Sequence, residues 1–95
     1  MPVNPGLDPY AASARTPAAP ARRAEAVTPN DTTDLTHYAK ALYVGQAGDV
    51  KLLPVGADDA APVTLKNHPA GYVPIQTRRV LATGTTAAHI VALTD

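Results

Sequence analysis

The chain has 95 residues and no cysteine, and its eight Lys and Arg balance its eight Asp and Glu. A chain of this length forms one small domain at most, and without cysteine it has neither disulfides nor thiolate–zinc sites. A net charge of zero argues against a nucleic-acid-binding protein, which normally carries a basic excess. No apolar run approaches the roughly 18 residues of a membrane span, and the N-terminus lacks the apolar core of a secretory signal. We therefore expect a soluble protein made in the cytoplasm, with no membrane partner.

The first third of the chain differs in composition from the rest. Residues 1–29 contain six of the ten prolines together with many alanines, and only two of their residues are β-branched aliphatics. Proline at this density interrupts helices and sheets, and so few large apolar residues cannot offset the entropy of ordering. We interpret residues 1–34 as an extended N-terminal arm and lead-in, in which 1–27 are disordered when free and extended when docked.

Residues 35–95 have the pattern of a small β module. Turn residues recur about every 8–12 positions, which is typical of an all-β sandwich or barrel. Pro54 cannot donate to a strand ladder, so its strand is predicted to be an edge strand or to contain a bulge. In "PVTLKN" the alternation predicts Val63 and Leu65 inward. The fold class predicted is a small antiparallel β-sandwich or barrel of five to six strands, connected as a meander. The predicted strands are 37–45, 50–55, 62–67, 72–82 and 89–93.

The chain closes on "RRVLATGTTAAHIVALTD", where two apolar runs flank Gly and Thr residues. This arrangement predicts a terminal β-hairpin. The last strand, "IVAL", is apolar on both faces, as is "ALYV" near residue 42. A sheet with one solvated face should alternate, so we expect a neighbouring subunit to cover the second side. The predicted subunit-interface residues are Tyr38, Leu42, Tyr43, Val44, Tyr72, Ile90, Val91 and Leu93.

No catalytic or metal-binding pattern is found. His37, His68 and His89 lie far apart in unlike settings, and Asp58 and Asp59 are better placed for a solvated turn than for acid–base chemistry. The only serine, Ser13, lies in the arm. We expect no enzyme activity and no cofactor.

Two further acidic and basic pairs are also assigned structural roles. Asp31 and Asp34 match no calcium-loop signature, and Asn30 or Asp31 is expected to close a turn after Pro29. In a strand, Arg78 and Arg79 would point to opposite faces and form no patch by themselves.

Three segments resemble the head-spike base proteins of tailed phages and phage-like gene transfer agents. They are "AVTPNDTTDL" (26–35), "KALYVGQAGDVKL" (40–52) and "HPAGYVPIQTRRVLATGTTAAHIVAL" (68–93), about two thirds of the chain. The terminal "RV…TGTTA…IVAL" pattern is the most specific. Asn30 stands where Ser is common in that family, and Tyr72-Val73 where smaller or branched residues are usual.

The resemblance implies a structural virion component on the exterior of the head. It would form a homo-oligomeric base at a capsid vertex, with a pentamer favoured over a trimer, and carry a spike-fibre protein that meets recipient-cell surface polysaccharide. The arm would lie in a groove of the capsid protein. The predicted capsid-binding residues are Pro9, Tyr10, Pro17, Pro20, Arg22 and Arg23.

Two other functions remain open from the residues themselves. A carbohydrate-binding β-sandwich would need exposed aromatic platforms with polar neighbours, and only Tyr72 is placed for one. A tail or baseplate adaptor would share the design of an arm followed by a β module, and sequence physics alone does not separate it from a head protein.

Overall fold

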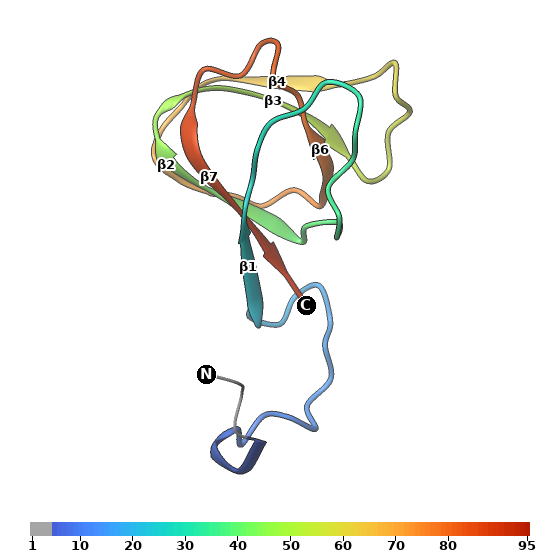
Figure 1. Cartoon of the computed structure of the whole chain (residues 1–95), viewed down its shortest axis with the longest axis vertical. Helices are drawn as coiled ribbons and strands as arrows, with labels where there is room; N and C mark the ends of the chain where they lie inside the picture. The colour runs from blue at the N-terminus through green and yellow to red at the C-terminus, as the bar shows by residue number, and fades with distance from the viewer. Residues whose placement is uncertain (1–4) are drawn as a thin grey trace.

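The computed structural model describes residues 5–95, so residues 1–4 of the predicted arm lie outside the described residues. Its strands form two antiparallel sheets, in the orders β1-β7-β2-β5 and β4-β3-β6, which face one another (Figure 1). The predicted all-β antiparallel class is confirmed, in the form of a two-sheet sandwich, and residues 5–95 contain no α-helix. The elements are η1 (Pro5–Leu7), β1 (Arg23–Ala26), β2 (Ala41–Gln46), β3 (Gly48–Pro54), β4 (Val63–His68), β5 (Gly71–Val73), β6 (Thr77–Val80) and β7 (Ala88–Thr94).

The predicted terminal hairpin and the meander are both wrong. Strand β6 pairs with β3, whereas β7 lies between β1 and β2 in the other sheet. The link between β6 and β7 crosses from one sheet to the other instead of reversing within one. It is held by backbone bonds from Leu81 N to Lys51 O at 2.9 Å and from Thr86 N to Asp49 O at 2.9 Å, and Gly84 takes the positive φ of 97° that its turn requires.

The sandwich has seven strands instead of five to six, for two reasons. One strand, β1, comes from the segment predicted as arm, and the predicted strand 72–82 is divided into β5 and β6 around Pro74, which cannot donate to a ladder. The predicted strand 37–45 begins only at residue 41. Before it, Ala39 forms a bridge to Thr77 of the opposite sheet.

Strand β3 is the central strand of its sheet, so Pro54 does not mark an edge strand. The register shifts between Leu53 and Pro54, which confirms the alternative prediction of a bulge at this proline. At the edge strand β4, the Val63 side chain is 43% exposed and Leu65 only partly buried. The inward placement predicted for Val63 is therefore wrong, because the residues that the structure describes leave this end of β4 uncovered.

The core lies between the two sheets and is built from aliphatic side chains of both. In β2 and β7 alternate residues point inward, as the period of two requires, whereas in β3 both Leu52 and Leu53 are buried, next to the register shift before Pro54. The core contains no aromatic residue, which agrees with the low aromatic content of the chain. Its buried residues are Ala39, Leu42, Val44, Val50, Leu52, Val73, Val80, Ala87, Ile90 and Ala92.

We expect Leu52→Ala to lower the free energy of unfolding by about 2–5 kcal/mol, because Leu52 is fully buried and its truncation leaves a cavity. The exposed Val63→Ala should change it by no more than about 0.5 kcal/mol. Urea unfolding of both variants checks the prediction. Equal losses for the two would contradict this assignment of the core.

Candidate assembly surfaces

The four-stranded sheet presents an apolar face to solvent. Its register places Ala24 opposite Leu93 and Ala26 opposite Val91, and Tyr43 between Val91 and Tyr72. Their sequence neighbours Leu42, Ile90 and Ala92 point into the core, so these residues point outward. Along this register the outward positions carry no Lys, Arg, Asp or Glu, and the exposed His89 lies at the end of the face beside Gly45. The residues of this outer face are Ala24, Ala26, Ala41, Tyr43, Tyr72, Val91 and Leu93.

Two tyrosines project from the outer face. The rings of Tyr43 and Tyr72 meet edge to face, with centroids 5.4 Å apart and planes at 63°. Tyr43 is 39% exposed and Tyr72 is 68% exposed. Both tyrosines line an open groove together with Ala21, Val91 and Leu93. This is a surface on which an apolar partner would lose little solvation and bury two large rings.

The structure divides the predicted interface residues into three groups. Tyr43, Tyr72, Val91 and Leu93 lie on the outer face. Leu42, Val44 and Ile90 are buried in the core of the same chain, because they occupy the inward positions of β2 and β7, and they offer no surface to a neighbour. Tyr38 lies elsewhere, in the loop before β2, where its hydroxyl donates to Asp34 Oδ2 at 3.1 Å.

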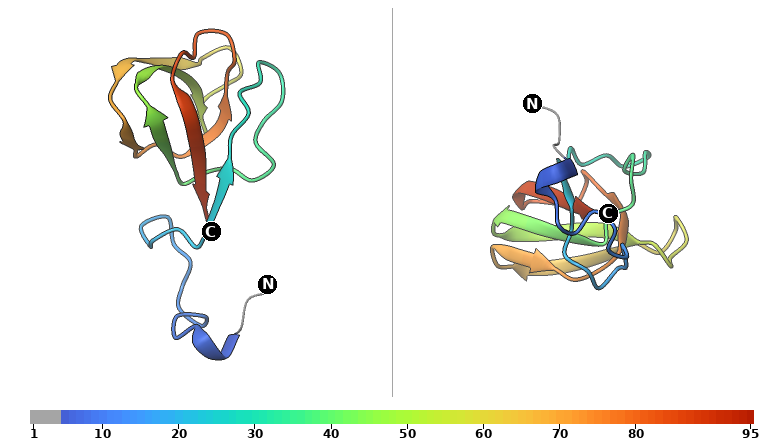
Figure 2. Two further views of the ribbon diagram at one scale, coloured as in Figure 1. Left: turned by 60° about the vertical axis from the view of Figure 1, so that its left-hand side comes forward. Right: turned by 90° about the horizontal axis from the view of Figure 1, so that it is seen from below.

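The N-terminal segment leaves the sandwich beside the C-terminus and projects away from it, with η1 at its far end (Figures 1 and 2). The guanidinium of Arg22 binds the carboxylate of Asp8 and donates to Tyr10 O at 3.0 Å. Lys40 Nζ donates to Thr16 O at 3.2 Å and to Ala19 O at 3.0 Å. These polar contacts, most of them exposed, contribute little each.

The predicted capsid-binding residues fall into two settings. Pro9, Tyr10, Pro17 and Pro20 are exposed on the projecting segment. Arg22 and Arg23 lie instead where that segment joins the sheet, since Arg23 is the first residue of β1 and pairs with Thr94. The strand β1 was not foreseen, because "RAEA" has no β-branched residue and is recognisable only through its partner β7.

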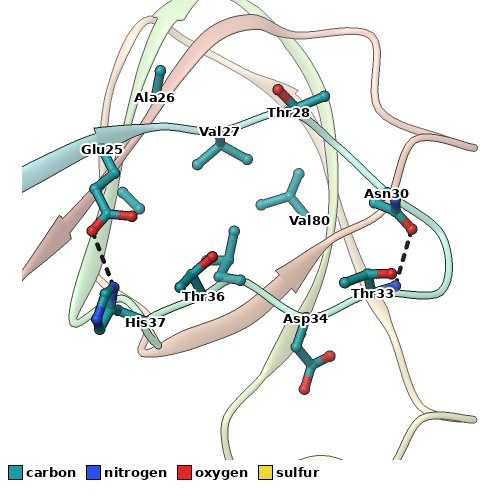
Figure 3. Close-up of a pocket in the computed structure, with 12 residues that line it drawn as sticks. Glu25, Ala26, Val27, Thr28, Asn30, Thr33, Asp34, Thr36, His37 and Val80 are labelled. Carbon is teal, nitrogen blue, oxygen red and sulfur yellow. Dashed lines mark hydrogen bonds and ion pairs between the residues drawn. The ribbon is translucent and has the colours of Figure 1, made fainter.

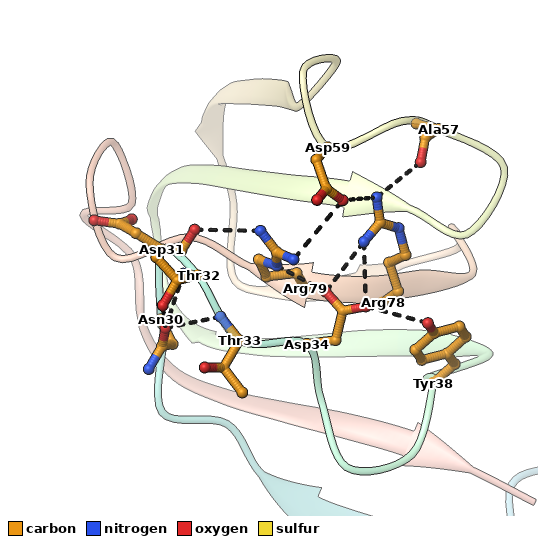
Figure 4. A network of polar contacts seen from close by, with 10 residues as sticks. All are labelled: Asn30, Asp31, Thr32, Thr33, Asp34, Tyr38, Ala57, Asp59, Arg78 and Arg79. Carbon is orange, nitrogen blue, oxygen red and sulfur yellow. Dashed lines mark hydrogen bonds and ion pairs between the residues drawn. The ribbon is translucent and has the colours of Figure 1, made fainter.

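A network of charged side chains fixes the lead-in, here residues 28–35 between β1 and β2, to the sandwich (Figure 4). Asp34 accepts hydrogen bonds from Arg78 Nη1 at 3.1 Å and from Arg79 Nε at 2.7 Å. Arg78 Nη2 also donates to Asp59 Oδ1 at 2.6 Å. The expectation that Arg78 and Arg79 form no common patch is therefore wrong, because the lead-in brings one carboxylate to both. Asp59, which was predicted to lie in a solvated turn, also takes part in the network through its hydrogen bond from Arg78.

The lead-in also covers the free edge of β6. Backbone bonds join Asn30 N to Val80 O and Leu35 N to Arg78 O, each at 2.8 Å. Asn30 Oδ1 accepts from the backbone of Thr32 at 2.9 Å and of Thr33 at 3.0 Å, which confirms the turn predicted after Pro29. An exposed edge strand can pair with strands of other chains, so by covering the edge of β6 the lead-in protects the fold from such pairing.

Residues 25–37 enclose a pocket of about 270 Å³ over the side of the core (Figure 3). Its floor includes Val80, and His37 Nδ1 lies 3.1 Å from Glu25 Oε1 across its mouth.

Within residues 5–95 no group of three or more His, Asp or Glu side chains is placed to hold a metal ion. No helix among the described residues is long and apolar enough to cross a membrane.

Two carboxylates of the lead-in are stabilised in their ionised form. The backbone N–H and hydroxyl of Thr83 hydrogen-bond Asp31 and hold its pKa below the ordinary value. Partial burial raises the pKa of Asp34, but hydrogen bonds from Arg79, Tyr38 and Arg78 together outweigh it, and the pKa is lowered. The network therefore depends on the ionised carboxylate of Asp34.

Comparison with known proteins is informative among the solved structures. No family model and no curated protein matches the chain. Among solved structures, a chain of the "Capsid of native GTA particle computed with C5 symmetry" is 34% identical, with a TM-score of 0.79. The match covers 92% of this chain and 99% of that chain. The fold and this identity define a structural protein of phage-like particles. The chain belongs to the same family as this protein of a gene transfer agent (GTA) capsid.

We expect Asp34→Asn to make stability less sensitive to acid. The folded-state pKa of Asp34 lies below its ordinary value of 3.8. Its charged contacts therefore stabilise the protein above that value, and this contribution is lost as the pH falls through the lower folded-state pKa. Between about pH 7 and pH 3, the wild type should lose more unfolding free energy than the variant.

The measurement is urea unfolding at both pH values. Asp58→Asn, which removes the same charge from an exposed loop position, serves as the matched control and should lose as much stability as the wild type. An equal loss in Asp34→Asn and the wild type would contradict the role given to the network.

Proposed function

We propose that this chain is the base of a head spike, a homo-oligomer on the exterior of a phage-like particle that holds a spike fibre at a capsid vertex. The single observation that carries the proposal is the similarity, over almost the whole length of both chains, to a chain of a GTA capsid. Within such a particle, the resemblance of three sequence segments to head-spike base proteins supports the base of the spike as the place of this chain.

A pentamer is favoured over a trimer. The structure that contains the similar chain was computed with C5 symmetry, and a protein that sits on a fivefold axis matches it most simply as a ring of five. The apolar outer face supports self-association, because Tyr43 and Tyr72 are exposed on it and tyrosine is enriched at protein–protein interfaces.

The projecting N-terminal segment supports attachment to a larger body. Its prolines restrict the backbone before binding, so less conformational entropy is lost when it is ordered on a surface. Arg23 supplies a cation at its root for acidic groups of a capsid protein, whereas Arg15 and Arg22 pair with Asp95 and Asp8 of the same chain. The fibre would then bind the opposite end of the ring and contact the polysaccharide of the recipient cell.

A carbohydrate-binding role for the chain itself is less well supported. The exposed ring of Tyr72 is surrounded on the outer face by Tyr43, Val91 and Leu93. Sugar sites combine aromatic faces with hydrogen-bonding groups that fix the hydroxyls, and the side chains that line the groove beside Tyr72 offer only the tyrosine hydroxyls.

We expect deletion of the gene to leave particle assembly and DNA content unchanged and to reduce adsorption of particles to recipient cells several-fold. The physical reason is that the base connects the fibre to the shell but is not part of the shell. The measurement compares purified particles from the deletion strain and from the same strain carrying the intact gene, by yield, packaged DNA and binding to recipients.

Antibodies against the chain should also bind intact particles that carry it. Absence of the chain from purified particles would overturn the proposal, as would normal adsorption by particles that lack it. Loss of particle assembly on deletion would indicate a shell component instead.

A further inference from the structure

We propose that the N-terminal segment of one copy lies on the outer face of the next copy, so that the subunits of the base are joined by exchanged arms. This inference rests on the proposed oligomeric base and names what covers its apolar surface. It assigns residues 7–10 to a neighbouring copy of the chain, and leaves Arg23 at the root of the arm for the capsid protein.

The chemistry of the outer face selects an uncharged, apolar occupant. The outward positions described above are occupied by Ala, Val, Leu and Tyr, with His89 at the end of the face, and the eight Lys and Arg and the eight Asp and Glu of the chain lie elsewhere. A charged partner would lose solvation there without gaining an ion pair. The occupant must therefore bring apolar side chains.

The size of the outer face selects an extended segment. Four strands at a spacing of about 4.8 Å are about 19 Å wide, and four residues at about 3.3 Å extend about 13 Å. The face thus has a projected area of about 250 Å², whereas a stable interface between globular partners needs about 800 Å² from each. A single extended strand of chain fits such a face better than a second globule.

The arm has the composition and length to be this segment. Leu7 is 79% exposed and Tyr10 is 67% exposed, and among the described residues of the projecting segment they are the exposed large apolar side chains. Fifteen or so residues in extended polyproline-like conformation span about 45 Å. That is more than twice the width of the face, so once the contacts of Arg22 with Asp8 and Tyr10 are released, the arm can reach a neighbouring sandwich and cross it.

The arm of the same chain points away from its own outer face. Arg22 N donates to Thr94 O and Asp95 O, each at 3.2 Å, and its guanidinium holds Asp8 and Tyr10. These contacts direct the segment past the end of β7, and η1 lies far from the sandwich (Figure 2). Leu7 and Tyr10 are therefore presented to another molecule. An arm on a neighbour's face is a head-to-tail contact, which is the type that closes rings.

The absence of cysteine from the chain allows a direct test by disulfide trapping. Full-length Tyr10→Cys and Tyr72→Cys are purified separately with different tags, mixed, and mildly oxidised. Both sites are exposed, so neither substitution should prevent folding. We expect a mixed disulfide between the two variants in several-fold excess over the matched control pair, Tyr10→Cys with Thr64→Cys, whose second site is exposed on the other sheet.

A double variant, Tyr10→Cys with Tyr72→Cys in one chain, separates exchange from self-coverage. Disulfide-linked chains of two or more copies support exchange, and a product that is only an intramolecular disulfide overturns it. Equal yields in the test and control pairs also overturn it. These outcomes are distinct from failure of the proposed function, because the chain would still be found in particles, bound through another surface.

Discussion

Strand β7 is the element on which the rest of the structure depends. It lies between β1 and β2, so it joins the N-terminal strand to the body of the sandwich. Its residues alternate between two apolar environments, with Ile90 and Ala92 in the core and Val91 and Leu93 outside. A one-residue slip would exchange these two sets. The strand therefore fixes both the core and the surface proposed for assembly.

A small sandwich with an all-aliphatic core has little stability to spare, because a domain of this size buries only about 60–65% of its unfolded surface. The lead-in compensates locally. Its carboxylate Asp34 joins Arg78 and Arg79, and its backbone covers the edge of β6. Assembly would add the stability that the single chain lacks, since oligomerisation is a common source of stability for small scaffolds.

The sequence predicts the class of the fold and the doubly apolar character of β2 and β7 from residue pattern alone. It does not predict which strands pair, because the turn around Gly84 is compatible with a hairpin or with a crossover between sheets. Strand β1 is invisible locally, since "RAEA" becomes a strand only by pairing with β7. The role of Asp34 depends on Arg78 and Arg79, more than forty residues away, and no local pattern carries that information. The predicted set of interface residues includes core residues. Alternation along a strand separates its two faces, but when both faces are apolar it does not tell which one points inward.

The mass of the purified full-length chain in solution, measured by light scattering, tests the central claim most directly. Exchanged arms between copies in a closed ring predict one discrete species with five times the mass of the chain. They also predict that Tyr72→Asp, which places a charge on the outer face, shifts this species to the monomer while Thr64→Asp does not. A wild-type chain that is monomeric at all concentrations, or an oligomer insensitive to Tyr72→Asp, would contradict the account.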